Sequence, residues 1–284
     1  MSTERPISMK SGKAVLAALQ SRGWNAVGID MGPDLPERLK AEGVEVAWLA
    51  LHGQFGEDGC VQGLLEILRI PYTGSGPSAS SFAMDKITTK RLLADSGIPM
   101  PSDHTWRVGD GIPSDISYPV VAKTPEGGST LGIQICADRE ALDSALDELR
   151  HMGQEVLLEE FVEGREITVA VLEGLALPVV EIVPDSGFFD FESKYTEGMT
   201  RYLVPAPLEA SIAQAAQNYA RISYEKMGLK GIARADFIVD SEGTPRFLEI
   251  NTIPGMTATS LSPMAAAEYG IPFEDLVERL LLSA

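Results

Sequence analysis

The sequence predicts a mixed α/β protein with a parallel α/β unit first and largely antiparallel sheets after it. In the first third, apolar strand-like runs at 24–30 and 44–51 alternate with helical patterns at 12–22, 36–42 and 59–68. Such alternation is typical of a parallel sheet covered by helices. In the last third, strand-like runs follow one another directly, which favours antiparallel pairing.

The pattern of expected helices and strands changes near Met84. A helix at 86–96 is expected to end at Gly97-Ile98-Pro99, a glycine stop followed by proline. The remaining expected elements are strands at 118–123, 130–136, 155–161, 166–172, 176–183, 231–239 and 245–251, with helices at 138–151 and 208–227. The turn Asp240-Ser241-Glu242-Gly243 predicts that the last two strands form a hairpin.

The composition excludes several classes of protein. A net charge of −18 argues against a nucleic-acid or anionic-membrane surface, which needs clustered Lys and Arg. No apolar run approaches the roughly 18–20 residues that span a bilayer, and the N-terminus has no signal-peptide pattern. Cys60 and Cys136 are interpreted as reduced core thiols. These observations predict a cytoplasmic protein without a membrane or nucleic-acid partner.

An acidic cluster lies on the predicted C-terminal hairpin. Alternation puts Glu249 and Asn251 on one face of their strand, and hairpin pairing can bring Asp236 opposite them. Two carboxylates and an amide oxygen suit Mg²⁺ shared with phosphate oxygens. Arg234 alternates onto the face of Asp236 and would add a fixed cation. A solvated polar face of a half-exposed sheet is the alternative.

Three further segments carry weaker signals. Lys123 ends a strand and precedes a Gly-rich turn at 124–132 that suits phosphates but is not a Walker motif. The strand end at 157–162 could read a nucleobase, and Glu166 a ribose. The loop at 51–59, which contains His52, follows a strand where α/β sheets place ligands. The alternatives are, in the same order, an ordinary hairpin turn, an ordinary strand end and a structural histidine.

Taken together and in order, the motifs of the chain resemble those of D-alanine–D-alanine ligases in the ATP-grasp superfamily. The resemblance covers essentially the whole chain. Its marks are Leu51-His52-Gly53, Gly56-Glu57-Asp58-Gly59, Pro71-Tyr72-Thr73-Gly74-Ser75-Gly76, Met84-Asp85-Lys86, Lys194-Tyr195, Arg234-Ala235-Asp236, Glu249-Ile250-Asn251-Thr252-Ile253-Pro254-Gly255-Met256-Thr257 and Ser260-Leu261.

The resemblance implies an ATP-grasp fold with ATP gripped between its last two domains. The expected domains are an N-terminal parallel α/β domain (1–84), a central subdomain (85–165) and a C-terminal subdomain with the metal site (166–284). The implied ATP-binding residues are Lys86, Lys123 and Lys194, with Glu159, Phe161 and Val162 on the adenine side and Glu166 at the ribose. Two Mg²⁺ (or Mn²⁺) ions would be held by Asp236, Glu249 and Asn251.

The family chemistry phosphorylates the carboxylate of one D-alanine with ATP, after which the amine of a second D-alanine attacks the acyl phosphate. The dipeptide serves peptidoglycan precursor synthesis. The resemblance implies that Arg234 and the Gly255 N–H stabilise the tetrahedral oxyanion. It also implies that Glu4 pairs with the first substrate's ammonium and that Ser260 and Leu261 hold the second substrate's carboxylate. His52 would bind substrate, and Ser8, Ser129 and Tyr195 would supply hydroxyls that close loops over the site.

Two departures from the family pattern stand out. Gly127 occupies a position where the family usually has Glu, with Glu126 displaced by one. About eleven residues that would form the family's first strand have no counterpart, and the hypothesis is that Met1 is an internal methionine. A ligase for another D-amino acid or a hydroxy acid and a catalytically weak nucleotide-binding protein remain as alternatives. A homodimer is compatible with the family.

Overall fold

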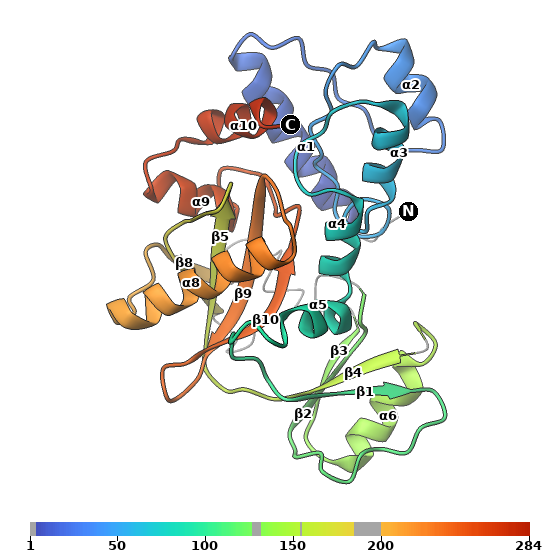
Figure 1. The fold of residues 1–284 in the computed structure, drawn as a ribbon, viewed down its shortest axis with the longest axis vertical. Helices are drawn as coiled ribbons and strands as arrows, with labels where there is room; N and C mark the ends of the chain where they lie inside the picture. Colours follow the sequence, from blue (N-terminus) through green and yellow to red (C-terminus); the bar gives the residue numbers. More distant parts are fainter. Residues whose placement is uncertain (1–3, 127–131, 154, 185–199) are drawn as a thin grey trace.

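Figure 1 shows the fold of the computed structural model, which describes residues 4–126, 132–153, 155–184 and 200–284. Three of the predicted site residues, Ser129, Lys194 and Tyr195, therefore lie outside the described residues. Among the described residues, no helix is long and apolar enough to cross a membrane.

The first third of the chain is helical. Its helices are α1 (Arg5–Ser21), α2 (Leu35–Ala41), α3 (Cys60–Leu68), α4 (Pro77–Met84) and α5 (Lys86–Leu93). Helix α1 begins earlier than predicted, and α4 was not predicted at all. Both have a proline in the first turn, where a missing backbone N–H costs nothing. Asp85 separates α4 from α5 and caps α5 by accepting a hydrogen bond from Thr88 N at 2.9 Å.

The prediction of a parallel sheet in residues 1–84 is wrong for the described residues. Segment 24–30 contains no strand, and segment 44–51 makes only an isolated parallel bridge from Ala47 to Tyr72. A strand exists only through hydrogen bonds to a neighbour, and the described residues give segment 24–30 no strand to pair with. Its Val27 is accordingly 46% exposed, whereas the pattern predicted a buried strand.

The middle of the chain forms a four-stranded antiparallel sheet. Its strands are β1 (Asp103–Arg107), β2 (Val120–Lys123), β3 (Ile133–Cys136) and β4 (Glu155–Glu160), in the order β1-β4-β2-β3. Helix α6 (Arg139–Leu149) packs its apolar stripe on one face, as Figure 1 shows in its lower part. Cys136 is buried there, but Cys60 on α3 is exposed, so the expectation of a second core thiol is wrong.

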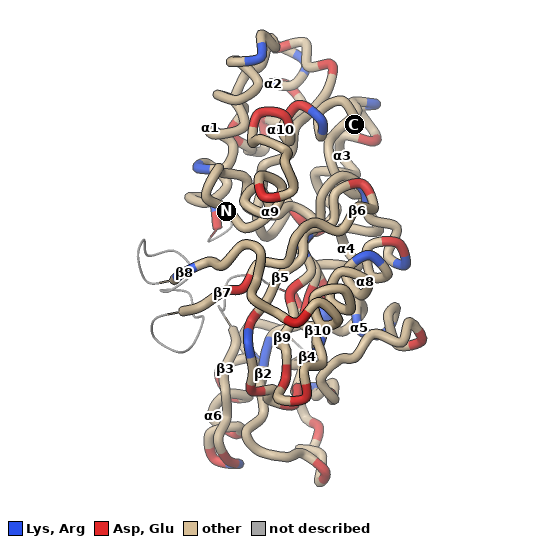
Figure 2. Tube along the Cα trace, turned by 90° about the vertical axis from the view of Figure 1, so that its left-hand side faces the viewer, with Lys and Arg blue, Asp and Glu red and all other residues tan. Residues whose placement is uncertain are grey.

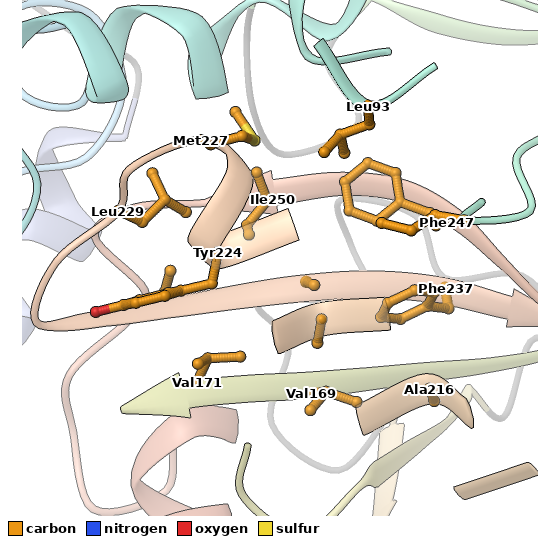
Figure 3. Packing of buried hydrophobic residues seen from close by; sticks show 14 of the residues in the cluster. Leu93, Val169, Val171, Ala216, Tyr224, Met227, Leu229, Phe237, Phe247 and Ile250 are labelled. Atoms are coloured by element: carbon orange, nitrogen blue, oxygen red, sulfur yellow. The ribbon is translucent and has the colours of Figure 1, made fainter. Parts of the chain in front are cut away.

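The C-terminal part contains a six-stranded antiparallel sheet. Its strands are β5 (Arg165–Leu172), β6 (Leu175–Ala176), β7 (Val180–Pro184), β8 (Thr200–Leu203), β9 (Ile232–Val239) and β10 (Pro245–Asn251), in the order β10-β9-β5-β7-β8 with β6 on β5. The predicted hairpin of the last two strands is confirmed. Helix α8 (Ala210–Lys226) covers one face, and Figure 3 shows Tyr224 and Ala216 with Phe237 and Phe247 in the core beneath it.

Helices cover the opposite face of the large sheet at one end. There α9 (Leu261–Glu268), α10 (Phe273–Leu282) and the first helix, α1, pack around Ala170, Leu172 and Ile232. Figure 1 shows α1 and α10 side by side at the top of the molecule. The rest of this face, toward the other ends of β5, β9 and β10, is polar and carries the predicted metal-binding residues. It is called the uncovered face because α1, α9 and α10 do not pack on it among the described residues, although Asp236 and Thr168 there are buried.

Candidate active site

A β-bulge sets the orientation of the acidic residues on β10. Phe247 pairs with Phe237, but the next pair is Glu249 with Asp236, so Leu248 is the extra residue. Without the bulge, Glu249 would share a face with Phe247, which is fully buried in the core under α8. With it, Glu249 turns to the uncovered face beside Asp236. The sequence prediction that these two carboxylates lie opposite each other is therefore confirmed.

Asp236 is the most constrained residue on this face. The Arg234 guanidinium donates to both of its carboxylate oxygens, Nε to Oδ1 at 2.9 Å and its terminal nitrogen to Oδ2 at 2.8 Å. Thr168 Oγ1 donates to Oδ1 at 2.6 Å from the neighbouring strand. This arrangement fixes the carboxylate of Asp236 and places a permanent cation beside it. The predicted neighbourhood of Arg234 and Asp236 is confirmed.

Glu249 and Asn251 continue the polar row on β10. The buried ammonium of Lys86, at the start of α5, lies 3.2 Å from Glu249 Oε2. Asn251 pairs with Arg234 in the strand register, and its Oδ1 accepts a hydrogen bond from Ile253 N at 2.9 Å. Since Lys86 comes from a helix distant in sequence, the structure brings together two groups of residues that the sequence predicted separately.

The donor set fits Mg²⁺ in its chemistry. No group of three His, Cys, Asp or Glu that could hold a metal occurs among the described residues. The predicted ligands Asp236, Glu249 and Asn251 are instead two carboxylates and one amide oxygen. All three are hard oxygen donors, and a Mg²⁺ ion completes its shell with water and phosphate oxygens rather than with a full protein cage.

A second polar cluster lies on the four-stranded sheet, on the face opposite α6. Glu159 of β4 is buried and ion-pairs with Lys123, the last residue of β2. Lys90 of α5 lies 2.5 Å from the other carboxylate oxygen of Glu159. Burial raises the pKa of Glu159, but the charges of Lys123 and then Lys90 outweigh this and hold the pKa below its usual value. The ionised carboxylate is therefore the stable form.

The segment that joins the two sheets contains the other predicted nucleotide residues. Phe161 and Val162 follow β4 and are half-buried. Glu166, the second residue of β5, pairs with Ile238 and shares the uncovered face with Thr168. Figure 2 shows Lys/Arg and Asp/Glu segments interleaved near β2, β4, β9 and β10. The nucleotide residues and the acidic row are thus on adjoining parts of the molecule.

His52 is buried where the loop after segment 44–51 meets α1. Its Nε2 is 3.3 Å from Ser11 Oγ, and Ser11 Oγ accepts a hydrogen bond from Met256 N at 3.2 Å. Ser8 Oγ accepts from His52 N at 2.9 Å. Burial, followed by the charge of Arg234, lowers the pKa of His52 to about 4, although a hydrogen bond with the Ile253 backbone opposes this. The imidazole is therefore neutral at pH 7.

Glu57 lies in the same loop and is also buried. Its Oε2 accepts a hydrogen bond from Gly53 N at 2.6 Å. Burial is the main reason that the pKa of Glu57 rises to about 8, and the carboxylates of Glu4 and Glu249 add to the effect, while the Gly53 N–H and the Arg234 charge oppose it. Glu4, at the N-cap of α1, and Glu249 of β10 therefore both act on the charge of Glu57.

The last predicted residues surround the start of α9. Ser260 is the N-cap residue, and its Oγ accepts a hydrogen bond from Thr257 N at 3.1 Å. A Cβ on Gly255 would come within 3.2 Å of Ser260 Oγ, so the chain is closely folded here. Leu261, the first residue of α9, is half-buried and packs on the core that α9, α10 and α1 share. Met256 ties this turn to Ser11 of α1.

The comparisons with known proteins agree with this geometry. The family "D-ala D-ala ligase C-terminus" matches residues 102–282, and "D-ala D-ala ligase N-terminus" matches residues 32–75. A D-alanine–D-alanine ligase of Syntrophotalea carbinolica is 48% identical over 285 residues, covering 100% of this chain and 93% of that protein. The chain belongs to the D-alanine–D-alanine ligase family. The ligase of Geobacter sulfurreducens is 45% identical over 288 residues, covering 100% of this chain and 91% of that protein.

Solved structures of D-alanine–D-alanine ligases share the fold. The enzyme of Bacillus anthracis complexed with ATP superposes with a TM-score of 0.87 at 31% identity, covering 100% of this chain and 94% of that one. The enzyme of Coxiella burnetii gives a TM-score of 0.83 at 26% identity, covering 99% and 90%. The predicted ATP-grasp fold with antiparallel sheets is therefore confirmed.

Three residues of this family member were missed as individual site residues by sequence reasoning. Ser11 connects His52 to Met256, Glu57 is buried among the charges of the site, and Lys90 contacts Glu159. Glu57 lay inside a motif that the sequence did indicate. Lys90 follows Lys86 by one helical turn, which is a signal that could have placed both on one face of α5.

Proposed function

We propose that this protein is an ATP-dependent ligase that joins two D-alanine molecules through a D-alanyl phosphate, with release of ADP and phosphate. The observation that carries the proposal is the row of Arg234, Asp236 and Glu249 on one polar sheet face, with the buried ammonium of Lys86 beside it. Such a row of fixed charges suits the transfer of a phosphoryl group between oxygen atoms. Family membership supplies the substrate class.

The first step transfers the γ-phosphoryl group of ATP to a carboxylate of D-alanine. A carboxylate is a poor electrophile, and the acyl phosphate provides a leaving group. Lys86 and Lys123 would bind phosphate oxygens, while Glu159, Phe161 and Val162 would bind the adenine side and Glu166 the ribose. Two Mg²⁺ ions held by Asp236, Glu249 and Asn251 would neutralise charge on the transferred group.

The second step is attack of the amine of another D-alanine on the acyl carbon, with phosphate as the leaving group. Arg234 and the Gly255 N–H would stabilise the tetrahedral oxyanion. Glu4 would pair with the first substrate's ammonium, and Ser260 and Leu261 would hold the second substrate's carboxylate. The imidazole of His52 contacts Ser11, and its backbone N–H donates to Ser8. In its neutral form it would line the substrate side without adding a competing cation.

Several parts of the proposal rest on the family resemblance alone. Ser129 and Tyr195 would close loops over the site, and Lys194 would contact the nucleotide. The chain would divide into units 1–84, 85–165 and 166–284. The dipeptide would serve peptidoglycan precursor synthesis, and a homodimer is compatible with the family. From its composition, the protein would act in the cytoplasm without a nucleic-acid or membrane partner.

Phosphate release tests the function. We expect release only when ATP, Mg²⁺ and D-alanine are all present, with D-alanyl-D-alanine as the product. Phosphate release with D-lactate as second substrate and none with D-alanine alone would favour a depsipeptide ligase. ATP binding without any turnover would favour a catalytically inactive nucleotide-binding protein.

Two variants localise the activity. Asp236→Asn keeps the shape but removes the charge that Arg234 fixes, so we expect kcat to fall by about 100-fold or more. Glu242→Gln, in the exposed turn of the same hairpin, is the matched control and should leave kcat within about twofold, because isolated surface charges contribute little. An Asp236→Asn variant with unchanged kcat would contradict the assigned metal face.

A further inference from the structure

Lys90 is a buried cation for which the proposed mechanism has no use. It lies one turn after Lys86 on α5, and 5% of its surface is exposed. Its ammonium donates to Pro101 O at 2.9 Å, lies 3.0 Å from Asp103 Oδ1 and lies 2.5 Å from Glu159 Oε1. An ammonium group has three protons, and these three oxygen atoms can accept all of them. Lys90 is therefore held in one position, at a cost in desolvation that only these contacts offset.

The two oxygens of Glu159 have different partners. Oε1 contacts Lys90, and Oε2 contacts Lys123. If Lys123 alone faced Glu159, turning Lys123 toward another anion would leave the buried Glu159 carboxylate without a cation, which is strongly unfavourable. With Lys90 on Oε1, Glu159 keeps a cationic partner when Lys123 turns away.

Helix α5 also connects the two sheets. At its first residue Lys86 contacts Glu249 of β10, and one turn later Lys90 contacts Glu159 of β4. Lysines four residues apart lie on one face of a helix, about 6 Å along its axis. One helix therefore contacts both Glu249 on the large sheet and Glu159 on the small one, and fixes their relative positions.

We propose that Lys90 is a positioning residue of the nucleotide site, which anchors Glu159 through Oε1 so that Lys123 can turn from Glu159 to a phosphate of ATP. The proposal rests on the nucleotide roles that the proposed function gives to Lys123 and Glu159. It assigns to Lys90 no contact with the nucleotide itself. Its effect is on the affinity for ATP and not on the chemical step.

The test compares three variants of the full chain. Lys90→Met removes the charge and keeps the length, Lys90→Arg keeps the charge, and Arg91→Met is the control, since Arg91 is exposed on the same helix. Affinity for a non-hydrolysable ATP analogue with Mg²⁺ is measured by calorimetry, and KM and kcat by phosphate release. Thermal unfolding confirms that each variant is folded.

We expect Lys90→Met to weaken analogue binding and raise the KM for ATP by about tenfold or more, the usual effect of a lost charge-assisted hydrogen bond. Its kcat and its KM for D-alanine should stay within about threefold, Lys90→Arg should recover most of the affinity, and Arg91→Met should match the wild type. A Lys90→Met variant that is folded and binds the analogue as tightly as the wild type would overturn the proposal. A wild type that binds no analogue would instead overturn the proposed function.

A double-mutant cycle separates positioning from a general loss of structure. If Lys90 acts through Glu159, adding Lys90→Met to Glu159→Gln should change the affinity by less than about twofold, because the residue it positions is already altered. The single and double variants are compared only where thermal unfolding shows that each is folded, because Glu159→Gln also removes the carboxylate partner of the buried Lys123. An equal loss of affinity from Lys90→Met in both backgrounds would overturn the proposal.

Discussion

His52 and Glu57 are buried in one loop, and their pKa values are shifted in opposite directions. The pKa of His52 is lowered to about 4, and that of Glu57 is raised to about 8, with burial as the first cause in both cases. Burial disfavours the charged form of either group, which is why a base and an acid move in opposite directions. Both side chains therefore favour the neutral state when the protein folds.

These shifts predict the dependence of folding stability on pH. The contribution of His52 is fully present above pH 6.5 and is lost as the pH falls through 4, because the unfolded histidine binds a proton that the folded one rejects. The contribution of Glu57 is fully present below pH 4.5 and is lost as the pH rises through 8. The two slopes cancel between pH 4.5 and 6.5, so the free energy of unfolding should be highest there.

The alkaline side gives the clearest measurement. Between pH 6.5 and 8 the Glu57 term outweighs the smaller and opposite change in the His52 term, and the free energy of unfolding should fall by about 1–2 kcal/mol. Urea unfolding of the metal-free protein at the two pH values measures this difference. Glu57→Gln should abolish the fall, whereas His52→Gln should preserve it. A fall of equal size in Glu57→Gln would assign it to other groups.

Among the elements, the β9–β10 hairpin depends on one extra residue. Leu248 shifts the register, so that Phe247 enters the core while Glu249 turns toward Asp236. Deletion of Leu248 would make Phe247 and Glu249 consecutive residues, so that simple alternation would place them on opposite faces in the same register with Phe237 and Asp236. We expect the deletion variant to fold and to release phosphate with a kcat within about tenfold of the wild type, with a lower melting temperature because a half-buried leucine side chain is lost.

The control for the deletion is Leu248→Ala, which keeps the bulge. Leu248 is half-buried, so the shortened side chain should cost about 1–2 kcal/mol and leave activity measurable. Circular dichroism melts and the phosphate assay distinguish the two variants. A deletion variant that is folded but releases no phosphate would show that alternation alone does not place Glu249.

The connection between the two sheets requires a glycine. A Cβ on Gly164 would lie 2.1 Å from Val239 O and 2.7 Å from Ile238 Cγ2, distances that cannot occur without movement of the β9 backbone. We expect Gly164→Ala to destabilise the protein by about 2–4 kcal/mol, measured by urea unfolding. Gly63, inside α3, has open space at its Cβ, so Gly63→Ala should stabilise by about 0.5–1 kcal/mol. Equal effects at the two glycines would contradict the steric argument.

Across the whole molecule, the first helix completes the core at the other end of the chain. Val15, Ala18 and Leu19 of α1 pack with residues of α9 and α10, and Trp24 Nε1 donates to Glu278 Oε1 at 2.8 Å. The same helix carries Ser8 and Ser11, which hold His52. Helix α1 therefore couples the stability of its packing against α9 and α10 to the position of His52.

Truncation of one side chain tests this coupling. Leu19→Ala should lower the free energy of unfolding by about 2–4 kcal/mol, the usual cost of removing a fully buried leucine side chain. Lys13→Ala, on the exposed side of α1, should change it by less than about 0.5 kcal/mol. Unfolding should remain a single transition in both variants. Separate loss of α1 signals before the rest of the protein would show that the helix is not part of the cooperative core.

The sequence by itself determined the elements whose signals are local. Period-2 alternation placed Asp236 beside Arg234, and the turn Asp240-Ser241-Glu242-Gly243 predicted the hairpin, because both depend only on neighbouring residues. The amphipathic pattern likewise predicted α6 and α8. The family motifs predicted which residues form the metal face and the nucleotide side before any contact was visible.

Only the tertiary structure decided what depends on distant partners. The predicted strand at 24–30 has no strand to pair with among the described residues, and the one at 44–51 has only the bridge from Ala47 to Tyr72. Strand β1 acquires its pairing from β4, about fifty residues later. Ser11, Glu57 and Lys90 became recognisable as site residues through burial and contacts from other elements. The physical reason is that the periodicity of a helix or strand depends on residues close together in the sequence. Hydrogen-bond partners, desolvation and register shifts arise only when separate segments pack together.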